Sequence, residues 1–376
     1  MNYIKKYLHW IAAALSFIIF LILLGVSNHM AASLLSQNMA DRWSSEGGAA
    51  QISCFFSVNS NITRDAIEEF EHSVDDMLEE DSITAESSGA DGEEANESAR
   101  LWADAYSADG SVTIASDGAS FSASAIGIGG DFFLFHPLQL VSGAYFSGND
   151  LMQDYCVLDE EAAWQLFGSN DIAGQMVTIG GVPHMVTGVI RRPDGRLNEA
   201  AGLSETVVYV SYDTLEKYGV NNGINHYEIV MPEPVSGYAL GKVGEMLADD
   251  EKNTEIIQND TRFSLLSRIQ TLSEFGTRSM NGKAIIYPYW ENEARGYEDI
   301  IALITVFMLI FLLYPAVFLI IMLIKWWRHR TWSFRQVWNK LYDKGERLAE
   351  AHREKRSGRN LNNNGKGENI YEKEYF

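Results

Sequence analysis

The sequence predicts an α+β extracytoplasmic domain between two transmembrane α-helices, in which a split βαβ base subdomain carries an inserted strand-rich subdomain. Three observations lead to this fold class. Apolar stretches long enough to enter a membrane lie near both ends of the 376-residue chain. The part between them holds 44 of the 51 acidic residues but only 14 of the 29 basic ones. That middle part alternates short apolar strands with amphipathic helices, separated by turn-forming residues.

The first apolar stretch covers residues 10–26 and follows a lysine-rich start. Its length fits a transmembrane helix or the core of a signal peptide. We favour an uncleaved anchor, because the helical pattern continues past it to Trp43. The sequence therefore predicts an N-terminus and first membrane helix over residues 1–27, and a helical stalk over residues 28–49.

The second apolar stretch, Ile300–Ile324, has 25 residues without a charge. It suffices for one span, since two spans need about 40 residues. Pro315 lies near its middle and is expected to kink the helix. Residues 291–299 have a helix-compatible composition and predict a stalk that transmits motion of the outer domain to the membrane helix at 300–325. The aromatic residues at 287–290 are assigned to an interfacial belt in preference to the core.

The charges beside the two stretches predict that both chain ends are cytoplasmic. Lys5 and Lys6 precede the first stretch, and Lys325, Arg328 and Arg330 follow the second. Because basic residues are enriched on the cytoplasmic side of membrane helices, the acidic middle is expected outside the cell membrane. An outer part this acidic repels nucleic acid, which argues against a DNA or RNA partner. The lipid bilayer is the first partner that the sequence predicts.

The outer part is expected to open with a strand at 51–58, an N-cap at Asn61 and a helix at 63–79. The apolar residues of that helix recur at helical spacing and form one face: Ile67, Phe70, Val74 and Leu78. Residues 80–100 are acidic and rich in Ser, Gly and Ala, which is typical of a flexible surface loop.

Two further strands, at 101–107 and 111–115, are expected to be joined by a turn at Asp109-Gly110, and Asp117-Gly118 forms a second turn of the same type. Three aromatic residues that follow a glycine-rich run are expected to be buried: Phe132, Phe133 and Phe135.

Residues 155–190 predict a strand, a short helix and a hairpin in succession. In chain order these are a strand at 155–158, a helix capped by Asp159 and Gly168, a turn at Gly174, and strands at 176–179 and 184–189 around Gly180-Gly181. Later elements are a strand at 206–210, a helix at 212–218, a strand at 227–231, a helix at 238–247 and a strand at 255–258. The last strand, helix and strand repeat the order found at 51–107.

The chemistry-bearing residues form no recognisable motif. Cys54 and Cys156 lie in strand-like runs, where buried thiols and a disulfide are both open. The sequence contains no Gly-x-x-x-x-Gly-Lys-Ser/Thr, Cys-x-x-Cys, His-Glu-x-x-His or Gly-x-Ser-x-Gly motif. The eight histidines are scattered, and His184 is expected on a surface strand. The sequence therefore predicts no enzyme and no catalytic, cofactor-binding or metal residues.

Residues 326–356 predict a basic amphipathic cytoplasmic helix. Such a helix either docks a cytoplasmic partner such as an ATPase or lies on the anionic inner leaflet. The candidate docking residues are Trp327, Arg328, Trp332, Arg335, Trp338 and Lys340. Residues 357–376, rich in Asn, Gly and charge, are expected to be disordered.

The stretch from Leu-Phe-Gly through Gly-x-x-Val-x-Ile-Gly-Gly-Val-Pro to Val-x-Gly-Val, with its Gly-x-x-Phe lead-in, resembles the periplasmic core domain of bacterial MacB-type (FtsX-like) ABC transporter permeases. The likeness is strong over residues 138–190 and extends in general organisation over 50–290. The signature positions are Gly143, Phe146, Leu166, Phe167, Gly168, Gly174, Gly180, Gly181 and Gly188.

The resemblance implies a base subdomain at 50–110 and 226–290, with an insertion at 111–225. Permeases of that type have four membrane helices, whereas this sequence predicts two. The resemblance therefore implies a noncatalytic membrane subunit, coupled mechanically to a separate ABC ATPase and a further permease subunit. The alternative is a free-standing membrane-anchored binding or scaffold protein that reuses the same outer domain. The small-molecule or peptide substrate is left open.

Overall fold

The computed structural model describes residues 2–44, 48–60, 62–83, 100–193, 195–203, 205–247, 253–277 and 284–329, with residues 342, 344 and 347. Most of the predicted surface loop and the whole predicted tail lie outside these residues. The chain forms two compact units, residues 1–17 with 311–376 and residues 18–310. The larger unit contains a mixed α+β domain, which confirms the predicted fold class.

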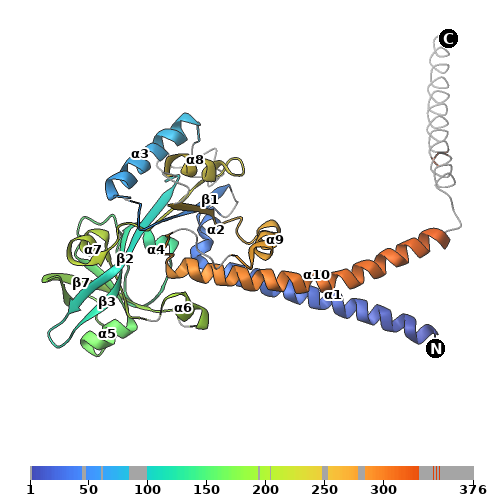
Figure 1. The fold of residues 1–376 in the computed structure, drawn as a ribbon, viewed down its shortest axis with the longest axis horizontal. Helices are drawn as coiled ribbons and strands as arrows, with labels where there is room; N and C mark the ends of the chain where they lie inside the picture. The colour runs from blue at the N-terminus through green and yellow to red at the C-terminus, as the bar shows by residue number, and fades with distance from the viewer. Residues whose placement is uncertain are drawn as a thin grey trace, which may run out of the picture. The chain divides into compact units, whose positions relative to one another are not determined.

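Within the described residues, the strands of the larger unit form one eleven-stranded sheet (Figure 1). Its order is β11-β1-β10-β2-β3-β8-β5-β7-β4, with β6 beside β2 and β7, and β9 beside β2. Neighbours on this path run antiparallel except for the parallel pairs β3–β8 and β5–β7. The strands are β1 Ala49–Phe56, β2 Ala103–Ala115, β3 Ser120–Gly130, β4 Gln139–Gly143, β5 Tyr155–Asp159, β6 Met176–Ile179, β7 Val182–Arg191, β8 Val207–Ser211, β9 Val220–Asn221, β10 His226–Pro232 and β11 Thr254–Gln258.

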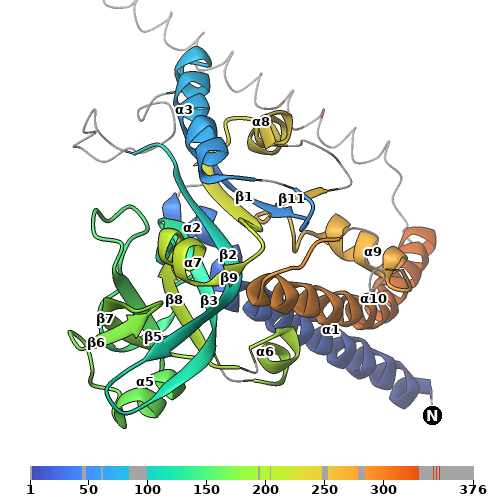
Figure 2. The same ribbon diagram turned by 60° about the vertical axis from the view of Figure 1, so that its left-hand side comes forward.

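Helices cover both faces of the sheet (Figures 1 and 2). They are α2 Met39–Trp43, α3 Arg64–Glu80, α4 Phe132–Phe135, α5 Glu160–Phe167, α6 Arg196–Ala201, α7 Tyr212–Tyr218, α8 Tyr238–Leu247 and α9 Leu265–Glu274. One apolar core joins the sheet to α3, α5, α7 and α8, and a second joins it to α2, α4 and the start of the long helix α10 (Tyr289–His329).

The alternation of β1 and β10 places their polar residues on the second of these faces. Ile52 of β1 and Tyr227 of β10 belong to the core with α3 and α8. Because successive strand residues point to opposite faces, Ser53, His226 and Glu228 point toward the face where α10 begins. All three are buried.

The predicted strand, helix and hairpin at 155–190 are confirmed. The Asp159 carboxylate caps α5 by accepting from the Ala162 backbone N–H at 2.7 Å. Gly168 ends the helix with φ +68°. Gly180 and Gly181 connect β6 and β7 with φ +59° and +83°, which L side chains rarely adopt.

The helix at 63–79 is also confirmed, and its four predicted apolar residues are buried. Its N-cap is Thr63, whose hydroxyl accepts from the Ala66 N–H at 3.3 Å, and the prediction of Asn61 as the cap was therefore wrong. α7 and α8 have the predicted bounds. The polar stretch between β7 and β8 contains α6, which is ended by Gly202 at φ +118°.

The predicted turn at Asp109-Gly110 was wrong, because β2 is one continuous strand through it and pairs with β3 along its length. Gly110 has a different role there. A Cβ at this position would collide with the backbone oxygen of Val220, so glycine lets β9 pair closely with β2. The turn at Asp117-Gly118 is found, since Ser116 N–H donates to Ala119 C=O at 2.8 Å.

Two long helices, α1 (Asn2–Ser33) and α10, flank the α+β domain, and each has the length and apolar composition of a membrane span. α10 runs through the predicted stalk at 291–299 without a break. After α1, the segment predicted as one helical stalk contains a 3-10 turn, η1 (Leu35–Gln37), and then α2. Asn38 ends α1 by donating its side-chain N–H groups to the carbonyls of Ala31 and Leu34.

Within the smaller unit, the chain-end portions of the two helices contact each other. Trp10 meets Phe318 edge-on with ring centroids 5.0 Å apart. The hydroxyl of Ser16 donates to the Phe311 carbonyl at 2.7 Å, which satisfies a polar group that lipid would leave without a partner.

Three further expectations are settled by burial. Phe132, Phe133 and Phe135 are buried, as predicted. Cys54 and Cys156 are both buried free thiols rather than a disulfide. His184 is buried rather than on the surface, with ring nitrogens 2.9 Å from the Val182 carbonyl and 3.1 Å from the Thr214 hydroxyl.

Candidate functional site

The predicted signature residues lie at turns and close backbone contacts rather than around one site. Gly143 of β4 pairs with Gly188 of β7. A Cβ on Gly143 would collide with the Thr187 carbonyl oxygen, and one on Gly188 would meet the Ala144 backbone. Phe146 and Leu166 are buried in different cores. The geometry explains these residue types structurally, and their role as a family signature remains a prediction.

The candidate docking residues are only partly within the described residues. Trp327 and Arg328 lie in the last turn of α10, and Trp327 is 62% exposed. Trp332, Arg335, Trp338 and Lys340 lie outside the described residues. Docking therefore stays a proposal.

Two groups of buried polar side chains lie where α10 meets the sheet. Trp290, in the first turn of α10, is 2% exposed and packs in the core with Met39 of α2 and Phe132 of α4. The assignment of Trp290 to an interfacial belt was therefore wrong. Tyr289 packs against the same core, and its hydroxyl lies 3.3 Å from that of Tyr209. The first turn of α10 is an integral part of the domain.

Beside Trp290 lies a group of paired charges that we call the arginine–glutamate cluster: Arg262, Glu291, Arg295, Glu298 and Glu255. The guanidinium of Arg262 donates to both carboxylate oxygens of Glu291, at 2.6 and 2.7 Å. Both side chains are almost fully buried. Such bidentate charged pairs are strong and geometrically specific.

The remaining members complete this cluster. Arg295 donates to Glu291 at 2.7 Å and to Glu255 of β11 at 2.7 Å, and Arg262 also contacts Glu298. Burial alone would lower the pKa of Arg295, but Glu291 and the neighbouring groups outweigh it and raise that pKa. The cluster therefore ties two turns of α10 to the edge of the sheet.

The segment that follows α1 is tied to the same place. Arg262 donates to the side-chain oxygen of Gln37 at 2.9 Å. Gln51 of β1 donates to the Ser36 carbonyl at 2.7 Å and accepts from the Met39 N–H at 2.8 Å. The chain that leaves one long helix and the start of the other are thus held to one region of the domain.

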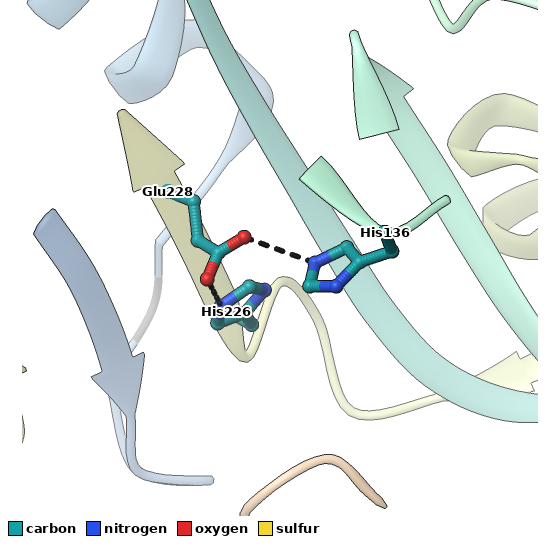
Figure 3. A group of neighbouring side chains, drawn as sticks. All are labelled: His136, His226 and Glu228. Carbon is teal, nitrogen blue, oxygen red and sulfur yellow. Dashed lines mark ion pairs between the residues drawn. The ribbon is translucent and has the colours of Figure 1, made fainter. Parts of the chain in front are cut away.

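A second buried group is the histidine–glutamate cluster of His136, His226 and Glu228 (Figure 3). Nε2 of His136 lies 2.9 Å from Oε2 of Glu228, and Nε2 of His226 lies 3.4 Å from Oε1. None of the three residues is more than 1% exposed. The indole of Trp290 contacts both imidazoles, with ring centroids 4.3 and 5.2 Å away.

Burial and neighbouring groups shift the pKa values of two members of this cluster. Burial lowers the pKa of His136, and the neighbouring Glu228 offsets only part of that effect. Burial by itself would raise the pKa of Glu228, but His136 and His226 outweigh it and lower that pKa.

Sequence reasoning missed both clusters. His226 and Glu228 alternate along one strand, which is the available signal that they share a face. The third member, His136, is 90 residues away in the sequence, and only the fold brings it there. The expectation of scattered histidines therefore fails for these two histidines.

Comparisons with known proteins agree with the fold. The family model for the MacB-like periplasmic core domain matches residues 48–241. The macrolide export ATP-binding/permease protein MacB of Chromobacterium violaceum is 36% identical over 75 residues, which are 19% of this chain and 12% of that protein. MacB of Agrobacterium fabrum is 31% identical over 108 residues, 28% of this chain and 16% of that protein. The matched stretches thus span less than a fifth of the length of these curated relatives.

Two solved structures are also similar. The periplasmic region of MacB from Actinobacillus actinomycetemcomitans has 19% identity and a TM-score of 0.39, and the match covers 59% of this chain and 92% of that one. The extracellular domain of the noncanonic ABC-type transporter YknZ from Gram-positive bacteria has 17% identity and a TM-score of 0.35, covering 55% and 99%.

Proposed function

This chain belongs to the family of the MacB-like periplasmic core domain, and from that premise we propose that it is a noncatalytic membrane subunit of a MacB-type ABC transporter system. In this proposal the outer domain is coupled through the two membrane helices to a separate ATPase and a further permease subunit. The observation that carries it is the continuity of α10, which begins in the buried core at Trp290 and continues into an uncharged apolar stretch of 25 residues.

The arginine–glutamate cluster supports mechanical coupling. A flexible linker would absorb a displacement of the membrane helix, whereas Glu291, fixed by Arg262 and Arg295, passes it to the sheet. Coupling between distant sites is carried by such contiguous packed and charged contacts. The segment after α1 reaches the same cluster through Gln37, so both membrane helices act on one region.

The proposed topology places both chain ends in the cytoplasm. The native cysteines are buried, and Trp164 on α5 is 64% exposed, so Trp164→Cys introduces an accessible thiol. We expect a membrane-impermeant maleimide to label this variant in intact cells and to leave the parent chain unlabelled. Labelling of Trp164→Cys only after the cells are opened would overturn the topology.

The proposed partners are tested by purifying the full chain from its native membranes in mild detergent. The expected result is co-purification of an ABC ATPase and a second permease, which is lost when residues 326–376 are deleted. A matched control replaces exposed Trp164 on the outer domain with Ala and retains the partners. If the full chain repeatedly brings down neither protein, the subunit proposal fails and the free-standing scaffold is favoured.

A further inference from the structure

We propose that His136, His226 and Glu228 bind a divalent transition metal ion, with Zn²⁺ as the best fit, at the place where α10 joins the sheet. The proposal concerns these residues alone and does not depend on the transporter function. Two imidazole nitrogens and one carboxylate oxygen form a donor set that zinc uses in proteins. First-row metals compete for such a site in the order of their intrinsic affinities, with zinc among the strongest.

The distances agree with one ion shared by the three residues. One donor atom from each residue lies within 4.8 Å of the other two. Two donors that are each about 2.1 Å from a tetrahedrally coordinated ion lie about 3.4 Å apart. The separations between His136 Nε2 and Glu228 Oε2, 2.9 Å, and between His226 Nε2 and Glu228 Oε1, 3.4 Å, are close to that value.

Several polar atoms of these three residues have no hydrogen-bond partner among the described residues. Among the described residues, His136 Nδ1 and Nε2, His226 Nε2 and Glu228 Oε2 make no hydrogen bond. The short contact between His136 and Glu228 is thus not aligned as a hydrogen bond. Buried polar groups are nearly always satisfied. Nε2 of His136 and Nε2 of His226 both lie close to the Glu228 carboxylate, so these orphaned atoms together call for a ligand.

The contacts behind the donors hold two of the residues in a binding orientation. Nδ1 of His226 lies 3.4 Å from the hydroxyl of Ser107, which leaves Nε2 as the ligating atom. Oε1 of Glu228 accepts from the Ser53 hydroxyl at 2.6 Å, and Ser53 in turn accepts from the Asn259 amide at 2.8 Å. Metal ligands are characteristically oriented by hydrogen bonds of this kind.

Aromatic rings pack against both imidazoles, and one cation lies near the carboxylate. Phe132 contacts His136 and Phe55 stacks on His226, with ring centroids 4.6 and 5.1 Å apart. Arg42 interacts electrostatically with Glu228, but its guanidinium donates to the carbonyls of Leu134 and Phe135. The carboxylate of Glu228 is therefore free to neutralise part of the charge of a bound ion.

A bound ion would link two segments of the domain beside Trp290. The ion would join β10 to the segment between α4 and β4, directly beneath the indole of the first turn of α10. A bound ion stabilises the folded state in proportion to the logarithm of its concentration, so metal occupancy sets how firmly this region is held.

The test uses the full chain, purified in detergent through a tag without histidine and without chelator. We expect about one Zn²⁺ per chain by elemental analysis. We also expect a Tm that falls after chelation and rises again with added Zn²⁺, and a visible absorption of tetrahedral Co²⁺ in the Co²⁺-loaded protein. A zinc content near zero, together with equal Tm values in Zn²⁺ and in chelator, would overturn the proposal.

Variants locate the ion. Glu228→Gln is expected to weaken Zn²⁺ binding by more than about 100-fold, since even the loss of an outer hydrogen-bond partner costs 10–100-fold. Ser107→Ala leaves the ligands in place, so it answers the question if Glu228→Gln fails to fold, and we expect roughly tenfold weaker binding. His184→Gln removes a buried histidine elsewhere and should retain one Zn²⁺ per chain. Equal affinity in all three variants would place the metal elsewhere and refute the site.

Discussion

The two buried clusters next to Trp290, one of five residues and one of three, differ in how their charged groups are paired. In the arginine–glutamate cluster, Glu291 is contacted by Arg262 and Arg295, and the network continues to Glu255 at the sheet edge. In the histidine–glutamate cluster, Glu228 lies between two imidazoles whose facing nitrogens make no hydrogen bond among the described residues.

The arginine–glutamate cluster is satisfied by its own ion pairs, whereas the histidine–glutamate cluster has donor atoms that a ligand could contact. A buried ion pair with every charge matched fixes a geometry, and removing one member leaves a stranded charge. In the histidine–glutamate cluster the imidazole nitrogens that face Glu228 make no hydrogen bond among the described residues, so their hydrogen-bonding capacity is not used within the cluster. Comparison of the two clusters therefore points to anchoring for the first and ligand binding for the second.

The largest effect is expected for Glu291→Ala. The guanidinium of Arg262 stays buried but, among the described residues, keeps a carboxylate contact only with Glu298. Breaking a buried ion pair in this way lowers the free energy of unfolding by about 3–5 kcal/mol. The measurement is urea unfolding in detergent followed by tryptophan fluorescence. The double variant Arg262→Met with Glu291→Met removes both charges and should recover much of the loss. A single variant as stable as the parent chain would show that the cluster does not anchor α10.

A smaller effect is expected for Glu228→Gln when it is measured in chelator. Glutamine is close in size to glutamate and keeps an oxygen that can accept from the Ser53 hydroxyl, so the main loss is the contact of the carboxylate with the two imidazoles. We expect a cost of about 1–2 kcal/mol. A cost equal to that of Glu291→Ala would mean that the two clusters are the same kind of structure.

Asp104 of β2 is a third buried carboxylate, and it tests how a buried carboxylate behaves when no cation among the described residues is paired closely with it. Burial, together with the charge of Glu71, raises the pKa of Asp104 to about 8, and its nearest cation, Arg100, is 3.9 Å away. The folded state therefore holds a proton that the unfolded state releases near pH 4, so the stability contributed by this proton is lost as the pH rises toward 8.

Asp104→Asn should remove that loss. We expect the variant to be less sensitive to pH between 5 and 9 and to be the more stable protein at the upper end, by on the order of 1 kcal/mol. Parallel stability curves for the variant and the parent chain across this range would contradict the raised pKa.

The smallest effect is expected for Arg64→Ala. Its guanidinium pairs with Asp213 at 2.8 Å and with Glu68 at 2.9 Å, but these side chains are 40–53% exposed. Exposed ion pairs contribute at most about 1 kcal/mol. The same urea unfolding assay then gives the effect of losing a surface ion pair. If Arg64→Ala lowered the free energy of unfolding as much as Glu291→Ala, the distinction between buried and surface charges would fail.

The sequence was sufficient where structure is decided locally. Asp159, Gly168 and Gly180-Gly181 each act on their immediate neighbours, so the helix and hairpin around them were predictable. Asp109-Gly110 has the composition of a turn, but pairing of β2 with β3 and β9 overrides it. The burial of Trp290 was missed because the residues that cover it come from distant segments.

The candidate site was beyond local reasoning for the same reason. Arg262 and Glu291 are 29 residues apart, and His136 and Glu228 are 92 apart, so only the completed sheet brings them together. Polarity alone does not reveal such groups, because isolated His, Arg and Glu residues are usually solvated.

Because α10 is one continuous helix, its first turn in the domain and its apolar stretch belong to the same element. Eleven residues, Tyr289–Asp299, precede the uncharged stretch and carry the indole of Trp290 roughly 15 Å from it along the helix axis. Trp290 and Glu291 are neighbours in the first turn of α10, so in the proposed coupling any movement of this turn would disturb the contacts of the indole with the histidines and those of Glu291 with Arg262 together.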